Sequence, residues 1–324
     1  MGTLIEQGSI VTGKANLDVF SNTLQQLAKN DRNIIVVTSD SRGSGKLVPF
    51  GQEFPAQHIE VGIAEQNLVG VAAGLASTGK KVFAVSPACF LTARALEQIK
   101  NDVAYSDNPV KLIGISAGVS YGALGTTHHS LHDFAVLRAI NNLIVVAPAD
   151  NFETEQAIRQ AAQMQHPVYI RFGKKPMPLL SPEQTHFTLG KGRIIREGED
   201  IALVATGETV YPALQAAEKL EREHHMRCTV ISMHTVKPLD YELLASVASK
   251  VGALLTIEEH SVYGGLGEAC ASFLLENGCY IPFKVMGIPD EYTVTGSQLE
   301  IFNHYGISEN GITENALKLI RQRN

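Results

Sequence analysis

The stretch His58-Ile-Glu-Val-Gly-Ile-Ala-Glu-Gln-Asn-Leu-Val-Gly70 joins a short apolar segment to a predicted helix that continues to about Thr78. The helix carries Glu65 in its first turn, and the small residues at 72–76 allow it to lie very close to a neighbour. A carboxyl group in such dry surroundings tends to hold its proton. The alternative interpretation is that Glu65 only complements the partial positive charge at the N-terminus of the helix.

The composition describes a soluble globular protein. The chain has 324 residues, of which 44% are hydrophobic and 19% charged, which is enough for two domains with their own cores. The formal net charge of −6 is spread without long runs, which argues against nucleic acid and anionic membrane as partners. No apolar stretch has the length of a membrane span, and the N-terminus lacks the regions of a signal peptide. The four cysteines lie singly, so we expect reduced thiols and a cytoplasmic protein.

Short apolar runs alternate with helical patterns in the first half of the chain. Strands are predicted at 33–38, 81–86, 110–116, 143–147 and 167–171. Helices are predicted from Asn16, with this residue as a cap, at 64–78, after a turn at 87–90, at 132–140 and at 151–163. This alternation predicts a doubly wound α/β domain over residues 1–180.

A second domain of the same class is predicted after a linker. Residues 173–190 contain three prolines and two glycines and interrupt the alternation. Strands then follow at 201–206, 228–232 and 253–257, with helices from Val210, from Tyr241, at 266–275 and from Thr313. Residues 190–324 are therefore predicted to form a second doubly wound α/β domain.

The segment Val61-Gly-Ile-Ala-Glu-Gln-Asn67 resembles the acidic motif of thiamine-diphosphate enzymes of the transketolase type. The resemblance implies thiamine diphosphate as the cofactor. It also implies that Glu65 shares a proton with the cofactor's aminopyrimidine, which favours the tautomer that deprotonates the thiazolium ring. The cofactor carries this chemistry, and the protein supplies the acid, the orientation and the dryness. Glu60 is the competing candidate, but its spacing from the Gly-Ile-Ala core matches the motif less well.

Two further segments match the family. Ala88-Cys-Phe-Leu-Thr92 resembles the segment that stacks an aromatic ring on the aminopyrimidine, which implies this role for Phe90. Gly125-Thr-Thr-His-His-Ser130 resembles a loop whose histidine contacts the substrate oxygen, which implies His128. Without these neighbouring motifs, a Phe that opens a helix is more often a core residue.

The histidine loop also departs from the family pattern. Many transketolases carry an aspartate four residues before the histidine, where it binds a donor hydroxyl, and this chain has Leu124. We expect either another acceptor, such as His129, or relaxed hydroxyl selectivity. His128, His129 and His132 stand close enough in sequence to suggest a metal site, but they lack carboxylate partners at a ligand-like spacing.

The substrate's anionic end has several candidate contacts. Tyr169-Ile-Arg171 resembles a segment whose arginine helps to hold a substrate phosphate, although a strand-end ion pair is an equally good interpretation of Arg171. Ser44, in the polar glycine loop after the first strand, and Lys14 fall where other phosphate contacts would lie. A histidine of that pocket is replaced by Ser116.

The second half of the chain completes the resemblance. Residues 230–240 and 258–267 resemble the C-terminal domain of transketolases. The Gly-Asp-Gly motif, with which the family binds magnesium, occurs nowhere in the sequence. The resemblance therefore implies the smaller subunit of a split transketolase that acts on sugar phosphates. Its partner, a chain of similar size, would supply the diphosphate and magnesium site in a heterotetramer of two chains of each kind.

Three alternatives remain open. One is the beta subunit of a 2-oxo-acid dehydrogenase decarboxylase. Another is deoxyxylulose-phosphate synthase, which normally carries both halves in one chain and has an arginine where this chain has Ala93. The third is a non-catalytic regulatory subunit, which the retention of Glu65 and His128 makes the weakest of the three.

Overall fold

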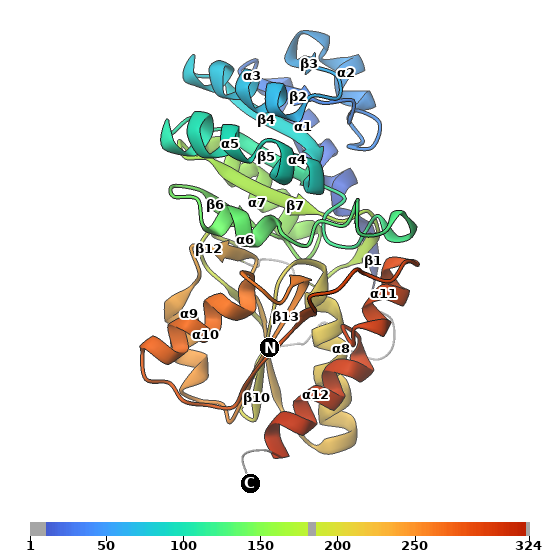
Figure 1. The fold of residues 1–324 in the computed structure, drawn as a ribbon, viewed down its shortest axis with the longest axis vertical. Coiled ribbons are helices and arrows are strands. Elements are labelled where there is room, and N and C mark those ends of the chain that lie inside the picture. The colour runs from blue at the N-terminus through green and yellow to red at the C-terminus, as the bar shows by residue number, and fades with distance from the viewer. Residues whose placement is uncertain (1–10, 181–185, 322–324) are drawn as a thin grey trace.

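The computed structural model describes residues 11–180 and 186–321. They form two lobes stacked along the long axis, with the N-terminal half in blue to green at the top of Figure 1 and the C-terminal half in yellow to red at the bottom. Each lobe contains its own mainly parallel sheet. The α/β class predicted from the sequence is therefore confirmed.

Seven strands form the sheet of the N-terminal lobe. In spatial order they are β12 (Thr235–Lys237), β6 (Ile144–Val146), β7 (Val168–Phe172), β5 (Lys111–Ile115), β4 (Lys81–Pro87), β2 (Ile34–Thr38) and β3 (His58–Glu60). All neighbours are parallel except β12, which pairs antiparallel with β6. Since β12 comes from the second half of the chain, the C-terminal lobe completes the first sheet, and the sequence did not predict this link.

Both faces of the first sheet are covered, as its continuous apolar runs predict. Along β2, Ile34 and Val36 point into one core, and Ile35 and Val37 point into another, because successive side chains of a strand alternate. Helices α1 (Asn16–Asn30) and α7 (Asn151–Gln163) cover one face, and α3 (Glu65–Ser77), α4 (Ala88–Arg94) and α6 (Asp133–Arg138) cover the other. The doubly wound arrangement is confirmed.

The C-terminal lobe repeats this arrangement. Its strands are, in spatial order, β14 (Phe283–Ile288), β13 (Leu254–Ser261), β10 (Ile201–Ala205), β11 (Cys228–Ser232) and the antiparallel β9 (Arg193–Arg196). Helices α8 (Val210–His224) and α12 (Glu309–Arg321) cover one face, and α9 (Tyr241–Ala248) and α10 (Leu266–Glu276) cover the other. One apolar cluster contains side chains of both β2 and β10, so the two lobes share a continuous core.

The remaining elements are short. They are α2 (Val48–Glu53), α5 (Leu96–Gln98), α11 (Gln298–His304), η1 (Pro55–Gln57), the π-helical η2 (Ile99–Tyr105), η3 (Gly122–Leu124) and η4 (Gly207–Thr209). The predicted linker contains β8 (Pro176–Pro178), which pairs with β1 (Thr12–Ala15), and its positions 181–185 lie outside the described residues. No helix in the described part of the chain is long and apolar enough to cross a bilayer.

Three local predictions were wrong. Asn16 is the first residue of α1, and the N-cap position is occupied by Ala15, whose side chain makes no capping hydrogen bond. Helix α4 already begins at Ala88, so Phe90 lies within a helix rather than in a turn. The last helix, α12, begins at Glu309, ahead of the predicted start at Thr313.

Candidate active site

The loop between β3 and α3 separates the two acids of residues 58–70. The carboxylate of Glu60 accepts hydrogen bonds from the backbone N–H groups of Asp40 and Gly62 at 2.7 and 2.8 Å. It also accepts one from the Thr38 hydroxyl at 2.7 Å. Burial acts to raise the pKa of Glu60, but these hydrogen bonds outweigh it and lower the pKa. Glu60 therefore fixes the loop, while Glu65, only 4% exposed, opens the helix.

Glu65 is paired with Arg94, which the sequence did not single out. The Nη1 atom of Arg94 donates to both carboxylate oxygens of Glu65, at 3.1 and 3.0 Å. Arg94 is the last residue of α4 and stands four residues after Phe90, a spacing that brings two side chains to the same face of a helix. This spacing from Phe90, together with the carboxylate of Glu65 on another predicted helix, was the only indication in the sequence that Arg94 belongs to the site.

Phe90 connects this pair to the histidine loop. The guanidinium carbon of Arg94 lies 4.6 Å from the centroid of the half-buried Phe90 ring. The ring of His128 meets Phe90 and Tyr121 edge-on, with both centroid distances at 5.3 Å. Glu65, Arg94, Phe90 and His128 thus form a continuous group of side chains, called here the Glu65 cluster. It offers a flat heteroaromatic molecule an acid, an aromatic surface and an imidazole, the groups expected for an aminopyrimidine and a substrate oxygen.

The C-terminal lobe holds the histidine loop in place. Nε2 of His129 donates to the carbonyl of Gly122 at 2.9 Å, so its Nδ1 accepts from the Thr293 hydroxyl at 2.7 Å. The Thr126 and Thr293 hydroxyls also bond to each other at 3.0 Å. Because both nitrogens of His129 are engaged within the chain, His129 could accept a donor hydroxyl only if one of these hydrogen bonds opened.

The side chains of His128, His129 and His132 have different contacts. His128 lies between two aromatic rings, His129 bonds to Thr293, and Nε2 of His132 lies 3.2 Å from the Thr92 hydroxyl. Across residues 11–180 and 186–321, no three or more His, Cys, Asp or Glu side chains are grouped in a way that could hold a metal ion. The local geometry therefore assigns each histidine a different neighbour.

Three of the predicted substrate contacts are open to solvent. Leu124 is 55% exposed at the end of η3. The Ser44 side chain is exposed, and its hydroxyl donates to the carbonyl of Ser41 at 3.2 Å. Lys14 is exposed in β1, where its backbone is held by the Asn151 side chain. Each side chain is accessible to a ligand, and their contact with a substrate remains a prediction.

Arg171 is placed differently. Its guanidinium is 4% exposed, donates to Asp133 at 2.8 Å and to the carbonyl of Glu259 at 2.8 Å, and lies 3.9 Å from the centroid of the Phe134 ring. Burial acts to raise the pKa of Asp133, but Arg171 and its other neighbours outweigh it and lower the pKa. The structure thus shows Arg171 in an ion pair, which was one of the two interpretations of the sequence. A contact between Arg171 and a substrate phosphate would require this pair to open. Ser116, which stands where the family has a histidine of the phosphate pocket, is also fully buried.

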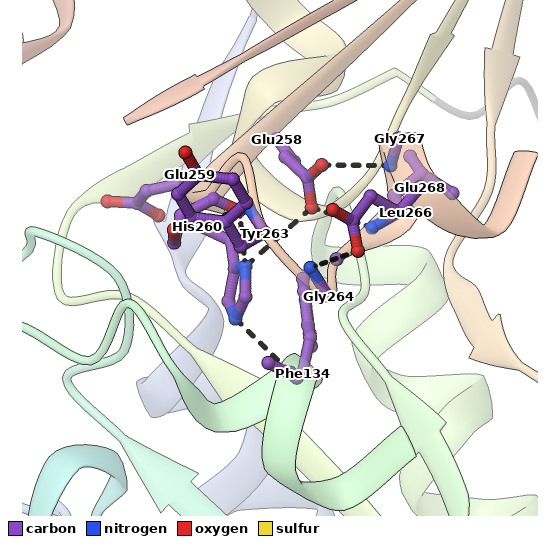
Figure 2. Close-up of polar contacts among 12 residues, drawn as sticks. Phe134, Glu258, Glu259, His260, Tyr263, Gly264, Leu266, Gly267 and Glu268 are labelled. Carbon is purple, nitrogen blue, oxygen red and sulfur yellow. Dashed lines mark hydrogen bonds and ion pairs between the residues drawn. The ribbon is translucent and has the colours of Figure 1, made fainter. Parts of the chain in front are cut away.

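The segment 258–267 joins the lobes beside α6. Figure 2 shows the carboxylate of Glu258 bonded at the start of α10, where it accepts from the first two N–H groups of the helix at 2.7 and 2.8 Å. The His260 ring stacks on Phe134 with centroids 5.0 Å apart, and its Nδ1 donates to the Ser261 carbonyl at 2.7 Å. Burial lowers the pKa of His260 to about 4. This segment therefore supports two helices: Glu258 holds the start of α10, and His260 packs against α6, which follows the histidine loop.

The two α/β lobes and their order define a protein of the transketolase type, the class that the sequence resemblance implies. Residues 13–178 match the family model described as "Transketolase, pyrimidine binding domain", and residues 190–312 match "Transketolase, C-terminal domain". The chain belongs to the transketolase family.

Its relatives define the chain more closely. It is 46% identical to a subunit of the apulose-4-phosphate transketolase of Phocaeicola vulgatus, over 94% of this chain and 96% of that one. It is 35% identical to a 6-deoxy-6-sulfo-D-fructose transketolase subunit of a Clostridium species, over 95% of both chains. The solved structure "Split gene transketolase, inactive beta4 tetramer" is similar with a TM-score of 0.86 and 35% identity, covering 96% of this chain and 100% of that chain. The chain is therefore the C-terminal, pyrimidine-binding subunit of a split transketolase, as predicted.

Deoxyxylulose-phosphate synthase, one of the alternatives left open by the sequence, is a relative of this chain. The chain is 38% identical to "1-deoxy-D-xylulose-5-phosphate synthase 1" of Geobacter metallireducens, over 95% of this chain but 50% of that one. A shared half is what a common family ancestry produces, whereas the split-transketolase relatives match this chain over nearly their whole length.

Proposed function

We propose that the chain, together with a partner subunit, transfers a two-carbon ketol unit from an anionic ketose to an aldose with thiamine diphosphate as cofactor. The observation that carries this proposal is the convergence of Glu65, Phe90 and His128 in one cluster. When bound, thiamine diphosphate supplies the nucleophilic carbon that accepts the ketol unit.

The side chains of the cluster are proposed to act in three ways. Glu65 shares a proton with a ring nitrogen of the aminopyrimidine, in the dry surroundings that its 4% exposure provides. Phe90 offers its half-buried ring for stacking. His128, held between two rings, forms a hydrogen bond with the substrate oxygen near the reacting carbon. Glu65 and His128 are the proposed catalytic residues, and Glu65 and Phe90 bind the cofactor.

The proposed partner carries the Gly-Asp-Gly motif and binds the diphosphate and Mg²⁺, since this sequence lacks that motif. The face of α3 beside Glu65 is open to such a chain. Gln66 and Asn67 are exposed, and a Cβ added at Gly70 or Gly74 would meet nothing within 4 Å. We expect a heterotetramer of two chains of each kind. The inactive beta4 tetramer of a relative supports the view that this kind of chain is incomplete alone.

The proposed donor is a ketose with a terminal phosphate or sulfonate. Relatives are named for apulose-4-phosphate and for a sulfofructose. The ordinary pentose phosphates of transketolases are the third group of candidate donors. Ser44 and Lys14 are accessible contacts for the anionic end, and Arg171 would join them only after its ion pair opens. Because Leu124 cannot accept a hydrogen bond and His129 is engaged, we propose relaxed selectivity for the donor hydroxyl beside the carbonyl.

We also propose a cytoplasmic location. The described structure contains four free cysteines, three of them buried, which suits a reducing compartment.

The first test combines the purified chain with a chain that carries Gly-Asp-Gly. We expect neither ketol transfer nor tight binding of thiamine diphosphate by the single chain, and both activities in a complex whose mass corresponds to two chains of each kind. Full turnover by the single chain would contradict the partner proposal. Turnover of the complex without thiamine diphosphate would contradict the cofactor.

The second test compares donors in the assembled complex. Phosphorylated and unphosphorylated ketoses are paired, and each is paired with its C3 epimer. We expect a large loss of kcat/KM without the anionic group. Only a modest difference is expected between epimers, because Leu124 offers the hydroxyl no acceptor. At this exposed position water can bond the hydroxyl instead, which avoids the cost of about 1–3 kcal/mol for a buried unpaired hydroxyl. Strict C3 selectivity with indifference to the anionic group would show that the enzyme recognises the donor by its C3 hydroxyl and not by its anionic end.

A further inference from the structure

Arg94 contacts both groups that the proposed cofactor would use. Its Nη1 atom binds the two carboxylate oxygens of Glu65 at 3.1 and 3.0 Å, and its guanidinium carbon lies 4.6 Å from the centroid of the Phe90 ring. A guanidinium is attracted to the negative face of an aromatic ring. An aminopyrimidine that pairs with Glu65 and stacks on Phe90 would need the same carboxylate and the same ring.

We propose that Arg94 is a placeholder. It fills the aminopyrimidine site while no cofactor is bound, and it has to leave before the pyrimidine can bind. This inference rests on the proposed function and adds a residue that acts before the reaction: Arg94 competes with the cofactor and so sets its affinity. Arg94 positions no reacting atom and is not a catalytic residue.

The geometry makes Arg94 displaceable. Only one of its nitrogens binds Glu65, so the pair lacks the two-pronged contact of the strongest arginine–carboxylate pairs. Its side chain is 52% exposed, so water can solvate the released cation. Arg94 ends α4, and the next residue, Ala95, has left helical geometry with φ −101° and ψ 19°. The side chain can therefore swing away without breaking the helix.

The placeholder also explains how the chain tolerates a buried acid without the cofactor. Glu65 is 4% exposed, and a buried carboxylate without a partner is costly. Arg94 provides that partner in the free subunit. The same contact closes the site, which agrees with the expectation that the chain alone binds thiamine diphosphate poorly.

The test measures cofactor binding rather than turnover. Arg94→Met keeps the length of the side chain and removes the charge, and Arg94→Gln serves as a second variant that retains hydrogen bonding. Lys100→Met is the matched control, because Lys100 is an exposed cation one to two turns further along the chain. The dissociation constant of thiamine diphosphate with Mg²⁺ is measured by equilibrium dialysis for each assembled complex.

We expect both Arg94 variants to bind the cofactor about tenfold more tightly than the wild type, equivalent to about 1.4 kcal/mol, and the control to be unchanged. A merely structural role of Arg94 would not tighten binding. Equal or weaker binding by both variants, beside a wild-type complex that binds and turns over, overturns the placeholder alone. A wild-type complex that neither binds thiamine diphosphate nor transfers a ketol unit overturns the proposed function itself.

Discussion

Two arginine–carboxylate pairs in the N-terminal lobe have the same chemistry and a buried carboxylate each, but they differ in how far the arginine is exposed. Arg94 approaches Glu65 to 3.0 Å, and Arg171 approaches Asp133 to 2.8 Å. The Arg94 side chain is 52% exposed, whereas that of Arg171 is 4% exposed. Water can replace the partner of an exposed charge, but a buried charge depends on the partner it has. The first pair can therefore open during function, and the second is part of the structure.

The difference shows that a polar residue in a family motif does not reveal its role until its surroundings are known. Tyr169 strengthens the buried pair by donating its hydroxyl to Asp133 at 2.7 Å, and the Glu259 carbonyl binds the other side of Arg171. Arg94, by contrast, is held by the Glu65 carboxylate and the face of the Phe90 ring. Mutations at the two pairs should consequently separate activity from stability.

The largest effect is expected for Glu65→Gln in the assembled complex. Glutamine keeps the shape but cannot share an acidic proton, so kcat should fall by roughly a hundred- to ten-thousand-fold while the complex still assembles. The measurement is steady-state ketol transfer together with the rate of hydrogen exchange at C2 of the bound thiazolium.

Glu60→Gln is the control for this variant. It removes a group that holds the loop through Thr38, Asp40 and Gly62, so it should affect stability more than turnover. Equal impairment of the two variants, or normal C2 exchange in Glu65→Gln, would reject the assignment of Glu65.

The second effect is on stability. Arg171→Met leaves the buried Asp133 without its cation and should cost about 3–5 kcal/mol in the free energy of unfolding of the isolated chain. Arg94→Met also leaves a buried carboxylate, Glu65, without its cation, but it should cost less than Arg171→Met, because water can reach the space that the 52% exposed Arg94 side chain vacates. Urea unfolding of both variants measures the difference. If Arg171→Met instead unfolds like the wild type and raises KM only for phosphorylated donors, the phosphate-contact interpretation of Arg171 is the correct one.

The part of the site that could be predicted lies in continuous motifs. Glu65, Phe90 and His128 each stand in a short segment whose sequence resembles the family, and the structure brings them into one cluster. The surroundings of Arg171 could not be predicted, because its two partners lie 38 and 88 residues away in the chain. Arg94 had a local signal, its spacing from Phe90, but its contact with Glu65 joins two different helices.

The fold was predictable to the same degree. Central strands such as β2, β5 and β10 are buried along their whole length, and their continuous apolar runs give a clear pattern. The edge strands β12 and β9 are short, and β14 is only partly buried, so none of them has a comparable signal. The crossing of β12 into the first sheet depends on contacts between the lobes, which no local pattern records.

The contact between the lobes offers one more test, because two acids there, Glu208 and Glu259, share a hydrogen-bond donor. The side-chain amide of Gln298 donates to Glu208 at 2.7 Å and to Glu259 at 2.8 Å. Glu259 also accepts from the N–H of Val119 at 2.9 Å, which joins the lobes. Burial and the neighbouring Glu208 raise the pKa of Glu259 from 4.5 to about 8.

Taken over one pH unit, the smallest expected effect is a slope of stability against pH. Between about pH 5 and 8 the folded chain keeps a proton on Glu259 that the unfolded chain has released, so the free energy of unfolding should fall as the pH rises through this window. One such proton contributes at most about 1.4 kcal/mol per pH unit. Glu259→Gln keeps an oxygen for Val119 and Gln298 but cannot ionise, so it should make the slope shallower, and Glu276→Gln, at an exposed position, should not. Part of the slope should remain, because burial also raises the pKa values of Glu153 and Glu258 to about 7. Urea unfolding at pH 5, 6.5 and 8 measures all three proteins. A slope in Glu259→Gln as steep as that of the wild type would mean that Glu259 is already ionised in the folded chain across this window.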